Sequence, residues 1–447
     1  MWRARRACPG PSHRNLPAII IMSHVAVPSE CRLAQTTAAP VNANHARRIG
    51  SFARALVGTC LLVGLSAFNA WWYWRDARAL PDANTISDWM RREQYPRAEA
   101  ALREQLRRSP HDGETRMMLA RTLAARGDVL GCARQLHEVP YWWPHKALAL
   151  YREGQSYIMI DRAKDAEAAW LDLIKDDPLH PVSSDVFHDA CQELLKLYAI
   201  EDRWEDAYPI MWTAYDRAAP VDRPVLLAMR VRPELERITP KESIALLKRY
   251  VSAAADDWEA MRALARAELA LGLHAEASLH FQACLKSRPD DVRAWRDYLA
   301  MLLEQGDLDA FLALLENAPK SAETESETWM YRGVAREKAG DWQAASEHFL
   351  KAIELDPTAP KYYYRLAMAE DRLGLHELAA DHRGRTKEMN EARRQLPSAY
   401  ADYQSALYGK NSLGHDMATA CTQLARICEK LGWARAAQAW DRLAISP

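Results

Sequence analysis

The sequence of 447 residues predicts an all-α fold: an α-solenoid of about nine to ten stacked helix pairs, preceded by one transmembrane helix. Glycines and prolines that recur at a spacing of about 34 residues predict the stack, and a composition rich in helix-forming residues agrees with it. The residues that keep the period are Gly272, Gly306, Gly340, Gly374, Pro110, Pro144 and Pro178. A run of twenty uncharged residues predicts the membrane helix.

Residues 1–54 form a basic tail that we expect to be disordered, because it has prolines and no amphipathic period. The tail holds eight arginines and one acid, Glu30, whereas the whole chain has a net charge of −1. The remainder is therefore mildly acidic, which argues against nucleic acid as a partner, since phosphate binding needs a basic face. Met22 is a second possible start and would leave the later segments unchanged.

Residues Ala55 to Trp74 are predicted to cross a membrane. As a helix, this uncharged run matches a hydrocarbon core of about 30 Å. Aromatic residues at 71–74 suit the membrane interface. The alternatives are a cleaved signal peptide and a buried core helix. Arg47, Arg48 and Arg54 favour a cytoplasmic N-terminus, with the repeats on the non-cytoplasmic (periplasmic) side.

The clearest repeat unit covers residues 326–359. Gly340 can adopt the positive φ of a short turn, and Asp341 is the expected N-cap of the second helix. Ala345 is small enough for the two helices to approach closely, and Pro357 ends the second helix. The other marked positions of the unit are Trp329, Gly333, Trp342, Phe349 and Ala352.

This pattern resembles the tetratricopeptide repeat (TPR) family, whose unit is two antiparallel helices in about 34 residues. The resemblance divides the chain into units of repeat length, with divergent stretches between and after them. The predicted segments are a basic tail (1–54), the transmembrane helix (55–74), a first TPR block (79–180, as 79–112, 113–146 and 147–180), divergent TPR-like helices (181–257), a second TPR block (258–393, as 258–291, 292–325, 326–359 and 360–393), a linker or capping helix (394–417) and a terminal TPR-like helix pair (418–447).

The sequence contains no motif that favours an enzyme, a cofactor or a metal site. Phosphate-binding glycine loops and nucleophile elbows are absent. The eight cysteines contain no C-x-x-C, so we expect small buried residues. His376 and His382 are six positions apart, as are His274 and His280, whereas a helical zinc pair needs a spacing of four. A catalytic site within residues 181–257 is the least favoured of the three functions considered, after a binding scaffold and an accessory subunit.

In the TPR family, recurring positions of the first helices line a concave groove. The resemblance carries these positions onto Arg262, Arg266, Arg293, Arg296, Met330, Val334, Tyr364 and Met368. They suggest a groove for a peptide or helix with an acidic end and a hydrophobic anchor. Alternatively, the arginines pair with acids of neighbouring turns such as Glu259 and Asp297.

The function that these observations favour is a non-enzymatic, membrane-anchored scaffold or adaptor that binds other proteins or peptides and takes no small-molecule substrate. The alternative is a regulatory or accessory subunit of an envelope enzyme or secretion complex, with catalysis in the partner. Fold resemblance by itself does not choose between them, because repeat scaffolds serve many processes.

Overall fold

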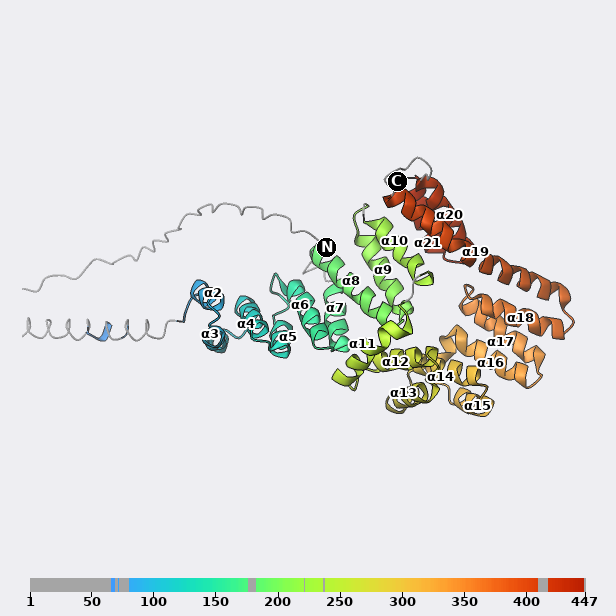
Figure 1. Cartoon of the computed structure of the whole chain (residues 1–447), viewed down its shortest axis with the longest axis horizontal. Coiled ribbons are helices and arrows are strands. Elements are labelled where there is room, and N and C mark those ends of the chain that lie inside the picture. The colour runs from blue at the N-terminus through green and yellow to red at the C-terminus, as the bar shows by residue number, and fades with distance from the viewer. Residues whose placement is uncertain are drawn as a thin grey trace, which may run out of the picture. The chain divides into compact units, whose positions relative to one another are not determined.

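The computed structural model describes residues 66–68, 71, 80–175, 182–220, 222–235, 238–408 and 417–445 (Figure 1). The chain divides into two compact units, Met1–Ala79 and Leu80–Pro447. In the first unit, residues 66–68 and 71 are helical; the basic tail and the rest of the predicted membrane segment lie outside the described residues. Among the residues described, none of the helices is both long enough and apolar enough to cross a bilayer.

Every regular element in the described part of the second unit is a helix, and the helices follow one another as ten consecutive pairs, as predicted. The first five pairs are α2 (Ala83–Arg91) with α3 (Tyr95–Arg108), α4 (Gly113–Ala125) with α5 (Val129–His137), α6 (Lys146–Met159) with α7 (Ala163–Ile174), α8 (Ser184–Ile200) with α9 (Trp204–Arg217), and α10 (Arg223–Val231) with α11 (Pro240–Ala253). The next five are α12 (Trp258–Ala270) with α13 (His274–Ser287), α14 (Val292–Gln305) with α15 (Leu308–Glu316), α16 (Ser326–Lys338) with α17 (Trp342–Leu355), α18 (Pro360–Arg372) with α19 (His376–Tyr408), and α20 (Met417–Lys430) with α21 (Ala434–Ile445). The two helices of a pair pack on each other except in the fifth pair, where α10 packs on α9 and α11 packs on α12. Two short 3-10 helices, η1 (Arg232–Glu234) and η2 (Lys320–Thr324), lie in connections between helices.

The turn between the two helices of a pair explains the glycine period. Gly340 has a φ of 79°, in the left-handed region that glycine adopts without a steric penalty. Two earlier turns use other residues at this position: Glu93 has a φ of 58° and Asp161 a φ of 62°. Glu93, Gly127 and Asp161 follow one another at the repeat spacing, so the N-terminal pairs keep the same period although only one of these three turns uses glycine.

Helix contacts in the 326–359 unit follow the predicted pattern. The side chain of Asp341 accepts a hydrogen bond from the backbone N–H of Ala344 at 3.1 Å, so it is the N-cap of α17. Ala345 and Phe349 are fully buried. Gly333 lies against Phe349, because a Cβ at position 333 would come within 2.4 Å of the Phe349 ring. The small residue therefore permits the close approach of α16 and α17.

The C-terminal part contains a longer helix than the repeat period predicts. Repeat-like sequence ends near Arg383, and the sequence predicts a linker or a capping helix over 394–417. Of these residues, 394–408 belong to α19, one helix of 33 residues that ends at Tyr408. Met389, Leu396 and Tyr403 are buried on it, so the second half of α19 has its own apolar face. That face explains why the helix continues after the repeat pattern stops.

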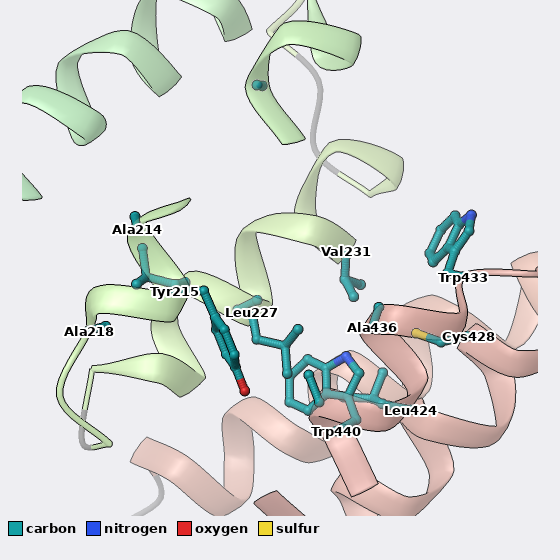
Figure 2. Packing of buried hydrophobic residues seen from close by; sticks show 14 of the residues in the cluster. Ala214, Tyr215, Ala218, Leu227, Val231, Leu424, Cys428, Trp433, Ala436 and Trp440 are labelled. Carbon is teal, nitrogen blue, oxygen red and sulfur yellow. The ribbon is translucent and has the colours of Figure 1, made fainter. Parts of the chain in front are cut away.

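The buried apolar residues form four clusters along the second unit. One cluster lies in α2–α6, one joins α7 and α8 to α11 and α12, and one runs through α12–α18. The largest cluster joins α6–α10 to α19–α21, which are far apart in sequence. Figure 2 shows Leu227 and Val231 of α10 facing Leu424 and Trp440 of the last pair. The array therefore makes a long-range apolar contact that the repeat period does not predict.

The cysteines in the described residues are all buried, as the sequence predicts for small apolar side chains. They are Cys132, Cys191, Cys284, Cys421 and Cys428. Burial raises the pKa of Cys191, Cys284 and Cys428 to about 12. These thiols therefore stay protonated at neutral pH and behave as small apolar side chains.

We expect Gly333→Ala and Gly384→Ala to have opposite effects on stability. Gly333→Ala places a methyl group against the buried Phe349 ring and is expected to destabilise by about 1–3 kcal/mol. Gly384 lies on exposed α19 with nothing near a Cβ, so Gly384→Ala should stabilise by about 0.5–1 kcal/mol. Denaturant unfolding midpoints of the two variants measure the difference. Equal stabilisation by both would contradict the close approach of α16 and α17.

Candidate protein-binding face

The predicted groove residues lie on four first helices, α12, α14, α16 and α18. Arg262 is the most buried of the four arginines, with 1% of its surface exposed. Its Nη1 donates to Asp297 Oδ2 at 2.7 Å, and its Nη2 lies 3.2 Å from Glu259 Oε2. For Arg262, the alternative prediction of pairing with Glu259 and Asp297 is therefore confirmed.

The other three groove arginines meet acids from a distant part of the chain, the α8–α9 turn (residues 201–206). Arg266 donates to the backbone oxygen of Asp202 at 3.1 Å and also pairs with its carboxylate. Arg293 binds Asp206 through two hydrogen bonds of 2.6 Å, one to each carboxylate oxygen. The paired geometry of guanidinium and carboxylate makes this the strongest class of ionic hydrogen bond.

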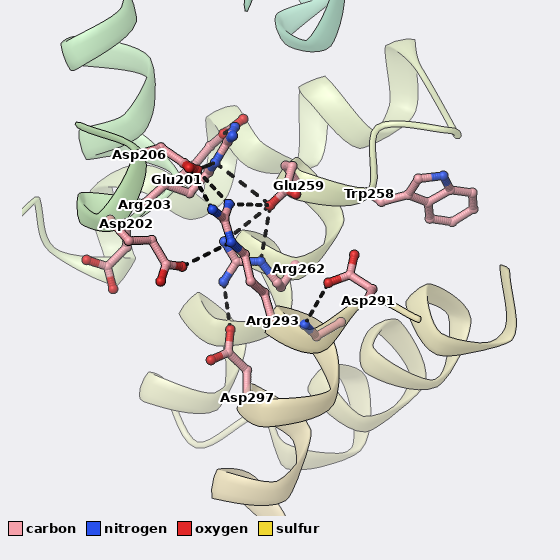
Figure 3. Close-up of polar contacts among 12 residues, drawn as sticks. Glu201, Asp202, Arg203, Asp206, Trp258, Glu259, Arg262, Asp291, Arg293 and Asp297 are labelled. Atoms are coloured by element: carbon pink, nitrogen blue, oxygen red, sulfur yellow. Dashed lines mark hydrogen bonds and ion pairs between the residues drawn. The ribbon is translucent and has the colours of Figure 1, made fainter. Parts of the chain in front are cut away.

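Arg296 extends the same contact to the start of α9 and to α16. Two of its nitrogens lie 3.3 Å from the oxygens of Glu205, and its Nε lies 3.0 Å from Glu327 Oε2. Figure 3 shows the acids of the α8–α9 turn facing the arginines of α12 and α14. We call this set the arginine cluster: Arg203, Arg262, Arg266, Arg293 and Arg296 with their carboxylate partners.

Arg203 lies inside the α8–α9 turn and is itself surrounded by acids. It donates to Glu167, Glu201 and Asp206 at 2.8–2.9 Å. Three carboxylates around one guanidinium leave an excess of negative charge. Glu201 is fully buried, and this burial raises its pKa to about 8 although Arg203 acts to lower it.

Three other acids of the cluster have a pKa shifted in the opposite direction. Burial by itself would raise the pKa of Glu205, Asp206 and Asp297, but the neighbouring arginines outweigh it and the net shift is downward. These carboxylates are therefore ionised at neutral pH. Their charges neutralise the arginines that the sequence suggested for an acidic partner.

Of the four apolar residues of the predicted groove, two are buried and two are exposed. Met330 and Val334 are buried in the α12–α18 core cluster. Tyr364 is 53% exposed and Met368 is 38% exposed, one helical turn apart on the same face of α18. The accessible part of the predicted groove is thus aromatic and apolar, whereas its cationic part faces acids of the same chain. Whether a partner binds any of the eight residues stays a prediction.

Two histidines considered for metal binding make the same contact in two repeats. His280 Nδ1 lies 2.7 Å from the buried Glu268, and His382 Nδ1 lies 2.8 Å from the buried Glu370. The two pairs are three repeat periods apart, so they are equivalent contacts between the helices of a pair. Within the described ranges, histidines, cysteines and acids form no group of three that could hold a metal ion.

The divergent stretch 181–257 was the third possible place for catalysis. Its described residues form the helices α8 to α11, of which α8 and α9 pack as a pair, α10 packs on α9 and α11 packs on α12. A cavity of about 600 Å³ there is lined mainly by apolar side chains, and Glu242 is the one carboxylate among its lining residues. This arrangement gives a candidate binding surface and not a set of converging acid and base groups.

Stacked helix pairs define the class of the protein, a helical-repeat protein of the α-solenoid type. Comparison with protein families finds two matches, both described as tetratricopeptide repeat, over residues 277–325 and 326–359. The chain is a tetratricopeptide-repeat protein. The matched stretch contains α14–α17 and includes the unit that the sequence shows most clearly.

Solved structures give similarities over about a third of the chain. MamA (residues 41 to end) from Desulfovibrio magneticus RS-1 is 26% identical, with a TM-score of 0.31, covering 38% of this chain and 97% of that one. The tetratricopeptide-repeat protein TTC0263 from Thermus thermophilus is 20% identical, with a TM-score of 0.31, covering 37% of this chain and 90% of that one. A comparison with curated proteins finds no match.

We expect Glu201→Gln to flatten the pH dependence of stability between pH 5 and 8. Since the pKa of Glu201 is raised on folding from its usual 4.5 to about 8, the folded state holds a proton in this window that the unfolded state loses. Stability of the wild type therefore falls as pH rises, by at most about 1.4 kcal/mol per pH unit from this group. Glutamine keeps the acceptor for Arg203 Nη1 without a charge.

Denaturant unfolding at several pH values measures this effect. The variant should be more stable than the wild type at pH 8, and the difference should vanish towards pH 5. A variant that is less stable than the wild type at pH 8 would show that the Glu201 charge stabilises the arginine cluster.

Proposed function

We propose that the chain is a scaffold that binds other proteins through its tetratricopeptide repeats. The observation that carries the proposal is the run of helix pairs with two family matches over residues 277–359. Such repeats present side chains of successive first helices on one surface, which suits binding an extended segment of a partner.

The part of this surface that we assign to the partner is the exposed pair Tyr364 and Met368 on α18. Both side chains project from a rigid helix, and tyrosine and methionine are effective anchors in interfaces. The arginines of α12 and α14 do not compete for this role, because carboxylates of the same chain already bind them. A partner segment with apolar anchors therefore fits better than one recognised by charge alone.

Site-specific photo-crosslinking in the intact cell tests this assignment. A photoreactive residue at position 364 should trap a defined protein, whereas one at Leu350, an exposed apolar residue of α17, should not. With the trapped protein purified, Tyr364→Ala and Met368→Ala should each weaken binding about tenfold or more, as for hot-spot residues. Leu350→Ala is the matched control and should leave binding unchanged.

Equal trapping at positions 364 and 350 would contradict the assignment of the partner to α18. The identity of the trapped protein separates the two functions considered for the chain. An enzyme of the cell envelope would favour the accessory-subunit alternative over a general adaptor.

We also propose that Ala55 to Trp74 anchors the repeats to a membrane, with the N-terminus in the cytoplasm and the repeats on the non-cytoplasmic side. The support is the uncharged run of twenty residues, the aromatic cluster at its end and the arginines before it. An anchor of this kind would hold the scaffold near membrane-bound partners and raise its local concentration there.

Cell fractionation and fused reporters test the anchor. The full chain should stay with membranes during alkaline extraction, and a chain without residues 55–74 should not. Alkaline phosphatase fused after Pro447 should be active, and a green fluorescent protein at the same place should be dark. The reverse pattern of reporter activity would refute the orientation.

A further inference from the structure

The loop before α6 presents two aromatic side chains to solvent. Tyr141 is 72% exposed and Trp142 is 51% exposed. The loop covers residues 138–145, whereas the equivalent loop before α4 covers only 109–112, so the repeat geometry does not require the added length. Large aromatic side chains are usually highly buried, and packing within the array leaves at least half of each of these two uncovered.

Backbone hydrogen bonds and packing hold the loop in a defined conformation. The backbone N–H of Trp143 donates to the Pro140 oxygen at 3.1 Å, which closes a turn with Tyr141 and Trp142 at its centre. The Trp143 ring packs on Gly113, the first residue of α4, where a Cβ would come within 2.5 Å of the ring. The third aromatic residue therefore fixes the loop to the array while the other two stay exposed. We call residues 140–143 the aromatic turn.

A series of contacts places the aromatic turn on the edge of the array where the second unit begins. Gln105 Nε2 donates to the Pro81 backbone oxygen at 2.6 Å. Thr115, in the first turn of α4, has its Oγ1 3.5 Å from Gln105 Oε1. Gly113, two residues before Thr115, packs on Trp143. The start of the second unit, the start of α4 and the aromatic turn therefore lie along one edge.

The proposed membrane anchor ends a few residues before this edge. Residues 75–79 connect Trp74 to Leu80, and a chain of this length reaches at most about 20 Å. The aromatic turn precedes α6, two pairs after the first helix α2. Neighbouring helices pack about 10 Å apart, so two pairs displace the turn by on the order of 20 Å along the edge. A bilayer that holds Trp74 is therefore within reach of the turn.

We propose that Tyr141 and Trp142 insert into the headgroup region of the membrane that Ala55 to Trp74 spans, so that the array contacts lipid at a second point. The inference rests on the proposed anchor. Tyrosine and tryptophan combine an apolar ring with a polar tip, which suits this interface, and residues 71–74 carry the same residue types at the end of the anchor. A second contact restricts the rotation that a single attachment allows, and the proximity given by the anchor makes a weak contact sufficient.

Burial of the aromatic rings, and not charge attraction, accounts for this contact. Arg116 of α4 pairs with Glu138, at the start of the same loop. Lys146 Nζ, at the end of the loop, donates to the His137 backbone oxygen at 2.9 Å. These two cations beside the turn are therefore engaged within the chain. We expect the rings to bind a neutral phosphatidylcholine surface without added anionic lipid.

Fluorescence quenching in vesicles tests the contact. The full chain is reconstituted in phosphatidylcholine vesicles, with a genetically encoded fluorescent amino acid at position 142 and a nitroxide quencher on the lipid headgroup. Met159 is the matched control position, since it is 73% exposed as the last residue of α6, about 20 Å from the start of that helix. We expect quenching at position 142 to be at least about threefold stronger than at position 159.

A second variant separates insertion of the rings from proximity through the anchor. With the fluorescent residue at position 141, Trp142→Ser should reduce quenching at least about threefold, because serine offers no aromatic ring to the interface. Met159→Ser is the control and should leave quenching at position 141 unchanged. Trp142 is exposed, so its substitution should leave the fold intact, which circular dichroism measures.

Three other outcomes would overturn the proposal, and they can be told apart. A full chain that leaves the vesicles on alkaline extraction rejects the anchor together with the turn contact. A chain that is retained, but with equal quenching at positions 142 and 159 or with quenching at 141 unaffected by Trp142→Ser, rejects the turn contact alone. In the cell, a photoreactive residue at position 142 should form lipid adducts, and a defined protein adduct in their place would assign the turn to a protein partner.

Discussion

The arrangement of the C-terminal half depends on one electrostatic constraint: arginines on α12 and α14 need carboxylates where they are buried. The α8–α9 turn supplies Asp202, Glu205 and Asp206 for this purpose. These three ion pairs are partly exposed, so each contributes modestly, and together they hold the turn against the arginine face. The face that a partner would reach in an open repeat array is consequently occupied by the chain itself.

A second contact between distant parts of the chain involves the neighbouring helices. The next helix, α10, packs on α9 and also on the last pair, so it joins the middle of the array to its C-terminal end. The long helix α19 and the pair α20–α21 complete that contact with an apolar face of their own.

The sequence predicted the local parts of this arrangement. The glycine turn, the Asp341 N-cap and the small residue at Ala345 follow from short-range chemistry, and each is found where expected. The repeat period was harder to detect in the N-terminal pairs, because Glu93 and Asp161 adopt the positive φ there and neither residue type indicates such a turn. A prediction from residue type finds such a turn only where glycine occupies it, whereas the turn itself is defined by the positive φ of the backbone.

The long-range parts had no comparable signal. Nothing in the spacing of Arg266 or Arg293 indicates that their acids come from Asp202 and Asp206, and repeat proteins usually contact only neighbouring units. The run of acids around Trp204 lies in the divergent stretch, where the repeat pattern offers no register. Similarly, α19 continues after its repeat because its second half is buried against helices distant in sequence. The repeat period gives no information about that contact.

The covered arginines also decide what kind of recognition remains for the scaffold. Buried ion pairs contribute little net stability compared with apolar packing, but the loss of one partner is strongly destabilising, so they fix a single arrangement. Since their charge is neutralised within the chain, the arginine face attracts an acidic partner only weakly. Under the proposed function, recognition then depends on the apolar anchors Tyr364 and Met368 on α18, where complementarity of shape selects the partner.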